Sequence, residues 1–197
     1  MKSLSFLAII YMFIPGCNSN SSVNQKVNDS LASKSSNSKA SFFPVTNFIK
    51  GEIYGIKQAG INPLQIINSI GKVDSAWLKI ENLDQAFDLF LNPVIDSISL
   101  IDYFNETSFL DQSIAAYTFT YEPSRVLPAS ITLKRWDVYI DQESNKVKRI
   151  YMLKQSGDTI RQLTWQAGDS AKIVTLLSNN NEEEIQQVKT IQWRFKE

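Results

Sequence analysis

The 197-residue sequence contains no histidine and only one cysteine, Cys17. Without histidine, neither a Ser-His-Asp nor a Cys-His arrangement can form, and no zinc site can have imidazole ligands. A single cysteine also excludes an internal disulfide and a Cys-x-x-Cys redox pair. These absences exclude most hydrolase and metalloenzyme chemistries, and we expect no cofactor and no metal.

Charge is balanced over the whole chain but not along it. The sequence has 20 Lys and Arg against 20 Asp and Glu, so nothing directs it to nucleic acid. Residues 42–123 have a net charge of −6, with 4 basic and 10 acidic residues, whereas residues 124–197 have +3, with 12 and 9. We interpret this as a charge-balanced monomer, with a dipole that docks a partner as the alternative.

Residues 1–16 have the organisation of a signal peptide. Lys2 precedes an apolar run from Leu4 to Ile14, which is too short to cross a bilayer interior of roughly 30 Å as a helix. The run ends in Ile14-Pro15-Gly16-Cys17, which resembles the lipobox of bacterial lipoprotein precursors. The resemblance implies that Cys17 becomes the acylated first residue and holds the protein to a membrane. An ordinary signal peptide or a buried core segment is the alternative.

Residues 17–41 are predicted to form the acylated cysteine and a flexible tether. Residues 18–41 include 9 Ser and 5 Asn among 24 positions and no aromatic residue, so they cannot bury enough surface to fold. In the best-known sorting scheme for lipoproteins an aspartate after the cysteine retains the protein at the inner membrane. Asn18 therefore favours the outer membrane, and the lack of a following acidic cluster favours a domain that faces the periplasm.

Residues 42–197 are predicted to form one domain, whose first half reads as helical. A helix from Asn47, with Thr46 as its N-cap, is indicated by apolar residues at helical spacing. A hairpin is predicted around Gly71-Lys72, between segments 64–70 and 73–81. Asn82 and Gln85 resemble a capping box that opens a short helix, which ends at Pro93. The apolar positions of the two helices are Ile49, Ile53, Ile56, Leu83, Phe87 and Phe90.

From residue 113 onwards the pattern is that of strands separated by short turns, which favours an antiparallel meander. The expected strands are 113–121, 130–141, 147–155, 159–166, 171–177 and 184–195. We therefore predict an α+β fold in which N-terminal helices pack on one face of a curved antiparallel sheet of about six strands.

One set of aromatic residues lies almost wholly on the expected strands: Tyr117, Phe119, Tyr121, Trp136, Tyr139, Tyr151, Trp165 and Trp193. Aromatic sheet faces can bind glycans or lipids, because rings offer apolar area with a polar rim. Such residues more often fill the space between a sheet and its helices. The candidate ligand-binding residues are Tyr117, Trp136, Tyr139, Trp165 and Trp193.

Two further patterns suggest chemistry. The pairs Asp84/Asp88 and Asp137/Asp141 could serve glycoside hydrolysis, although Asp at such positions usually lies at a solvated face or a turn. Asp followed by Ser or Thr and an apolar residue resembles the O-glycosylation acceptor of Bacteroidota envelope proteins, whereas Asp-Ser is also common in turns. The candidate glycosylated hydroxyls are those of Ser30, Ser75, Ser97, Thr159 and Ser170.

The lipobox and tether, together with four short strings, resemble envelope lipoproteins of Bacteroidota for which no catalytic residues are assigned. The strings are Phe42-Phe43-Pro44-Val45-Thr46, Phe109-Leu110-Asp111-Gln112, Trp136-Asp137-Val138-Tyr139 and Arg149-Ile150-Tyr151. The resemblance implies an envelope location and no particular activity. Our leading hypothesis is a non-enzymatic binding or assembly module with an envelope protein partner. The alternatives are a carrier of an apolar or glycan ligand in the curved sheet and an Asp/Glu-dependent envelope hydrolase.

Overall fold

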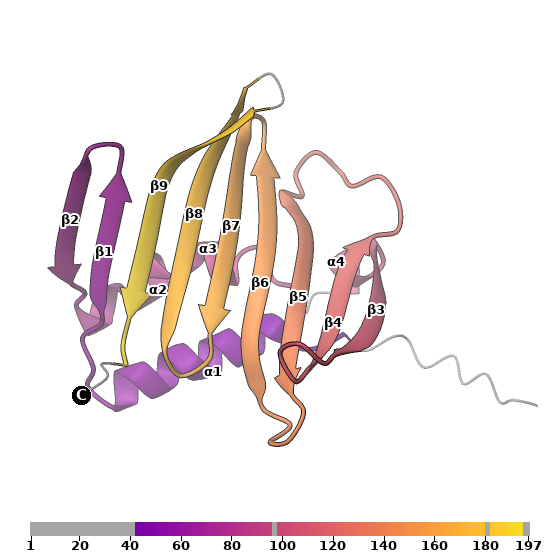
Figure 1. The fold of residues 1–197 in the computed structure, drawn as a ribbon, viewed down its shortest axis with the longest axis horizontal. Coiled ribbons are helices and arrows are strands. Elements are labelled where there is room, and N and C mark those ends of the chain that lie inside the picture. Colours follow the sequence, from indigo (N-terminus) through magenta and orange to yellow (C-terminus); the bar gives the residue numbers. More distant parts are fainter. Residues whose placement is uncertain (1–41, 96–97, 180–181, 195–197) are drawn as a thin grey trace, which may run out of the picture. The chain divides into compact units, whose positions relative to one another are not determined.

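Nine antiparallel strands form one sheet in the computed structural model, which describes residues 42–95, 98–179 and 182–194 (Figure 1). The order across the sheet is β2-β1-β9-β8-β7-β6-β5-β4-β3, so that neighbouring strands from β3 to β9 are also consecutive in sequence. The strands are β1 (Leu64–Ser69), β2 (Lys72–Trp77), β3 (Phe104–Asp111), β4 (Ala116–Pro123), β5 (Leu133–Asp141), β6 (Val147–Ser156), β7 (Thr159–Gln166), β8 (Ser170–Asn179) and β9 (Glu182–Gln192).

The helices lie on one face of this sheet (Figure 1). They are α1 (Val45–Gln58), η1 (Ile80–Asn82), α2 (Leu83–Ala86), α3 (Asp88–Leu91) and α4 (Ile98–Ile101). Only α1 is longer than four residues; its residues Val45, Ile49, Ile53 and Ile56 recur at helical spacing and are buried. The predicted helix after Asn82 is broken at Phe87 into α2 and α3, and the side chain of Asn82 caps neither η1 nor α2.

Thr46 has a different role from the N-cap that the sequence suggested. The N-cap of α1 is Pro44, and Thr46 is fully buried in the first turn of the helix. Its Oγ1 accepts a hydrogen bond of 2.9 Å from the backbone N–H of Ile95. Thr46 therefore connects α1 to the segment that follows α3.

The core fills the space between the helices and the sheet with aromatic rings. Phe87 lies 5.0 Å from Trp165 and 5.8 Å from Trp193, measured between ring centroids, and Trp136 stacks on Tyr121 at 4.7 Å. The indole N–H groups of Trp136 and Trp165 have no hydrogen-bond partner within the described parts of the chain. Such a ring-filled interface stabilises the fold through apolar burial rather than through polar contacts.

The core also contains one lysine. Lys154 on β6 is only 4% exposed, and its Nζ donates hydrogen bonds to the backbone carbonyls of Leu89 and Asn92. These carbonyls lie at the C-terminal end of α3, where they have no partner within the helix. Lys154 thus ties α3 to the sheet.

The predicted six-stranded meander is wrong in its strand number and in its arrangement. The segment 104–111 is an additional strand, β3, which lies at the edge of the sheet and has mostly exposed side chains. The hairpin at Gly71 exists, but β1 also pairs with β9, so the hairpin extends the sheet to nine strands. The helices after α1 are short segments between strands and are not a layer that precedes the sheet in sequence.

Among the helices that the structure describes, none has both the length and the apolar composition needed to span a membrane.

Candidate functional site

The face of the sheet opposite to the helices, called the open face below, carries charged and aromatic side chains. Successive residues of a strand point to opposite faces, so the residues between core positions lie here. On β6, for example, Ile150 and Met152 are buried towards the helices. Arg149 and Tyr151 alternate with them along the strand and therefore lie on the open face. No described helix covers this side (Figure 1).

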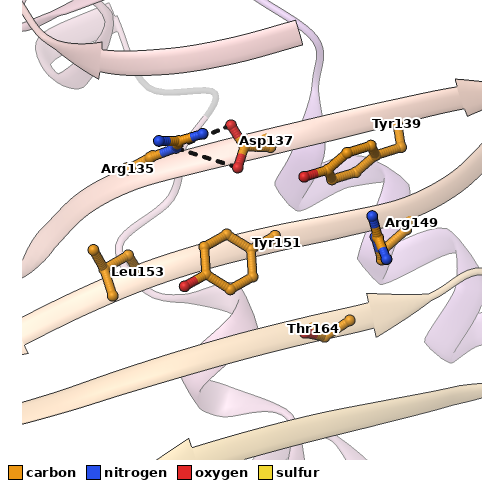
Figure 2. Close-up of a pocket in the computed structure, with 7 residues that line it drawn as sticks. All are labelled: Arg135, Asp137, Tyr139, Arg149, Tyr151, Leu153 and Thr164. Atoms are coloured by element: carbon orange, nitrogen blue, oxygen red, sulfur yellow. Dashed lines mark hydrogen bonds and ion pairs between the residues drawn. The ribbon is translucent and has the colours of Figure 1, made fainter. Parts of the chain in front are cut away.

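A hollow of about 460 Å³ lies over β5, β6 and β7 on the open face (Figure 2). At one end the Nε of Arg135 donates to both carboxylate oxygens of Asp137, each at 3.2 Å. Nη1 of the same guanidinium lies 3.1 Å from Oε1 of Glu122 on β4. The hollow is lined by Arg135, Asp137, Tyr139, Arg149, Tyr151, Leu153 and Thr164.

Asp137 is the buried charge of this site. Its side chain is 3% exposed, against 43% for that of Arg135, so the carboxylate lies beneath its partner. Burial opposes the charge of Arg135, but the hydrogen bond and the charge of Asp137 outweigh burial and raise the pKa of Arg135. Burial, reinforced by the charge of Asp137, also raises the pKa of Tyr151, so its phenol stays protonated at neutral pH.

Arg149 and Tyr139 form the other end of the hollow. They are directly paired across β6 and β5, and the guanidinium carbon of Arg149 lies 4.2 Å from the centroid of the Tyr139 ring. The ring supports the face of the guanidinium and leaves its N–H edges available, which is a common arrangement for recognising planar anions. Arg149 forms no ion pair within the described residues.

Two further hollows adjoin the first along the open face. One, of about 200 Å³, shares Tyr139 and Arg149 with it and adds Lys148. The other, of about 480 Å³, shares Thr164 and is lined by Gln166, Ala167, Asp169, Ser170, Lys172 and Arg194. The three hollows share lining residues and therefore adjoin one another over β5 to β8.

The structure separates the five predicted aromatic site residues. Trp136 and Trp165 are fully buried in the core between helices and sheet, and Trp193 is 6% exposed there. Tyr117 on β4 is 41% exposed and does not line any of these three hollows. Tyr139 alone of the five lines the hollow.

The carboxylates of the two predicted pairs make separate contacts. Asp84 lies 2.6 Å from the Nζ of Lys57, and Asp88 accepts a hydrogen bond from Asn92. Asp141 accepts hydrogen bonds from Ser144 in a turn, and these bonds lower the pKa of Asp141. In the described ranges, no cluster of three or more acidic, Cys or His side chains could hold a metal ion.

Three of the predicted glycosylation positions are described. Ser75 is exposed on edge strand β2, Thr159 is half-buried at the start of β7, and the half-buried Ser170 donates a hydrogen bond of 2.9 Å to Asp169. Ser30, Ser97 and the predicted lipidation site Cys17 lie outside the described residues. Glycosylation and lipidation stay predictions.

Sequence reasoning did not identify Arg135, Arg149 and Thr164 as site residues. A usable signal was present, because residues an odd number of positions apart on a strand face opposite sides. Trp136 and Tyr139 are three apart, so they could not both line one surface of β5. If Trp136 is assigned to the core, the open face receives Arg135, Asp137 and Tyr139.

No protein-family model matches the chain, and no curated protein or solved structure shows significant similarity to it.

Proposed function

We propose that this chain is a lipid-anchored, non-enzymatic binding module of the cell envelope, which presents the open face of its sheet to a protein partner. The anchor is the acylated Cys17, and Asn18 favours the outer membrane with the domain in the periplasm. The observation that carries the proposal is the hollow between Arg135 and Thr164, where charged and aromatic side chains are held in place on an uncovered sheet.

The composition of the hollow supports a protein partner. Tyr and Arg are enriched at the centres of protein interfaces, because they combine large contact area with directed hydrogen bonds. Here Arg135 is fixed by Asp137 and Arg149 by Tyr139, so little side-chain freedom is lost on binding. A rigid sheet positions these side chains before the partner arrives.

An apolar ligand between the helices and the sheet is not favoured by this arrangement. Phe87, Trp165 and Trp193 are in mutual ring contact there, and Leu163 and Met152 are fully buried beside them. The hollow of the open face is the better-supported binding surface.

Site-specific photocrosslinking in cells tests the proposal. A photoreactive phenylalanine analogue replaces Tyr151 in the hollow, and in a control protein it replaces Tyr54, which is 63% exposed on α1. We expect a discrete crosslinked protein from position 151 that is absent from position 54 and is lost when Arg149→Glu is added. The same crosslinked species from both positions, or none from position 151, would overturn the proposal.

A further inference from the structure

We propose that the open face recognises an acidic, extended peptide segment of the partner, with Arg149 as the main carboxylate-binding residue and Lys172 as a second one. This inference rests on the proposed function and specifies the chemistry of the bound segment.

The three adjoining hollows have a surplus of positive charge in their linings. Their linings contain the cations Arg135, Lys148, Arg149, Lys172 and Arg194 and the carboxylates Asp137 and Asp169. Arg135 forms ion pairs with Asp137 and Glu122. The Nζ of Lys148 lies 3.8 Å from Oδ2 of Asp141. Arg149 and Lys172 form no ion pair with any described residue; a hydrogen bond from Ser113 and, to a smaller extent, the charge of Arg149 lower the pKa of Asp111.

Arg149 holds its guanidinium in a fixed plane. Its guanidinium is stacked on Tyr139 at 4.2 Å, which fixes the plane of the group without using its N–H donors. A guanidinium held in this way can bind a carboxylate through two parallel hydrogen bonds. The stack also covers one face of the Tyr139 ring, so that face is not available as a platform for a sugar.

The spacing of Arg149 and Lys172 suits an extended peptide. Arg149 on β6 pairs with Gln166 on β7, and Thr164 on β7 pairs with Lys172 on β8. Arg149 and Lys172 therefore lie two strands apart across the sheet and two residues apart along the strands. Neighbouring strands are about 4.8 Å apart and alternate residues about 6.8 Å, which puts the two Cα atoms roughly 12 Å apart. Side chains four residues apart on one edge of an extended peptide have nearly this separation, about 13 Å. An extended segment with carboxylates on one edge therefore fits both cations.

Binding of labelled peptides to the full-length acylated protein in detergent micelles tests this inference. The probe is a fluorescein-labelled peptide in which Glu alternates with Ser and Thr, and its matched counterpart carries Gln in place of Glu. Fluorescence anisotropy gives the dissociation constant of each. We expect binding of the Glu peptide only, and binding that weakens as NaCl is raised.

Charge-neutralising variants locate the binding site. Arg149→Gln is expected to weaken binding of the Glu peptide about tenfold, because a charge-assisted hydrogen bond is lost. Lys172→Gln is expected to weaken it about threefold, because the lost charge is more exposed. The matched control is Arg125→Gln, because Arg125 is stacked on Tyr103 at the same 4.2 Å but lies outside the three hollows. This control should change the dissociation constant less than twofold.

Three results would overturn the inference: equal binding of the Glu and Gln peptides, equal effects of Arg149→Gln and Arg125→Gln, or tight binding of a polyuronate chain with no binding of the Glu peptide. If the Glu peptide does not bind but the crosslink from position 151 is present, the acidic-peptide inference fails and the proposed function stands. If the peptide binds at Arg149 but no protein is crosslinked in cells, the proposed function fails instead.

Discussion

Both carboxylate oxygens of Asp137 accept a hydrogen bond from the Nε of Arg135, each at 3.2 Å, although the two residues are only two positions apart on one strand. The spacing puts both side chains on the same face of β5, and the longer arginine folds over the shorter aspartate. The pair therefore forms a fixed wall of the hollow from a single strand. The contribution of this pair to the stability of the fold can be measured separately from binding.

Replacement of Arg135 is expected to destabilise the protein more than replacement of Glu122, its other ion-pair partner. Arg135→Met leaves the carboxylate of Asp137 buried without its counter-charge, which should lower the free energy of unfolding by about 1–3 kcal/mol, below the value for a fully buried pair because Arg135 is partly exposed. Glu122→Gln, at an exposed position, should lower it by less than about 1 kcal/mol. Urea unfolding followed by tryptophan fluorescence gives both values. Equal effects of the two substitutions would show that Asp137 does not depend on Arg135.

Thr46 offers a second test, on the connection between α1 and the chain after α3. Thr46→Val keeps the shape of the side chain but removes the acceptor for the N–H of Ile95, which should cost about 1–3 kcal/mol. Hydrogen exchange of the Ile95 amide should become faster in this variant. Thr46→Ser retains the hydroxyl and should leave that exchange rate nearly unchanged, so unaltered protection of Ile95 in Thr46→Val would contradict the assigned bond.

The proposed lipid anchor leads to a fractionation test. Cys17→Ala should move the protein from the membrane to the soluble fraction, because two or three acyl chains are needed for stable anchoring. Ser19→Ala serves as the neighbouring control and should stay with the membrane. Mass spectrometry of the native protein should find Cys17 as the first residue with acyl chains on it, and an unmodified Cys17 or a different N-terminus would contradict the prediction.

The local part of the fold could be predicted from the sequence, whereas the strand neighbours could not. Strands β4 to β9 lie close to the predicted segments, because polar turns separate their alternating apolar residues. The pairing of β1 with β9 puts Leu64 opposite Gln192. No local sequence pattern can predict a contact between residues so far apart in the chain. β3 has few buried side chains, so it lacks the alternation by which a strand is recognised.

For a similar reason, the candidate site could not be predicted. Aromatic content suggested one surface, but Trp136 and Trp165 belong to the core, and the open face combines Tyr139 with charged residues that have no distinctive spacing in sequence. Arg149 becomes a candidate site residue only because strand pairing puts it opposite Tyr139. A site that is built across several strands depends on the register between them, and local sequence patterns do not give that register.

Lys154 leads to the last prediction, a rise of stability at alkaline pH. Burial lowers the pKa of Lys154 from 10.5 to about 8, against the opposing effect of Asp88. Between these two pH values the unfolded chain binds the proton more strongly than the folded protein does, so stability increases as the pH rises from about 8 to 10.5. Below pH 8 the full cost of the buried charge is present, and above 10.5 it is gone.

Comparison with two variants isolates this effect from that of other groups that titrate in the same range. Relative to Lys154→Met, which cannot titrate, the wild-type protein should gain up to about 3 kcal/mol in free energy of unfolding between pH 8 and 10.5. Lys154→Arg keeps its charge throughout this window, so the wild-type protein should gain by a similar amount relative to it as well. Urea unfolding at several pH values measures each difference. A difference that stays constant from pH 8 to 10.5 would mean that the ammonium of Lys154 is as stable in the core as in water, and that its bonds to the carbonyls of Leu89 and Asn92 compensate fully for its burial.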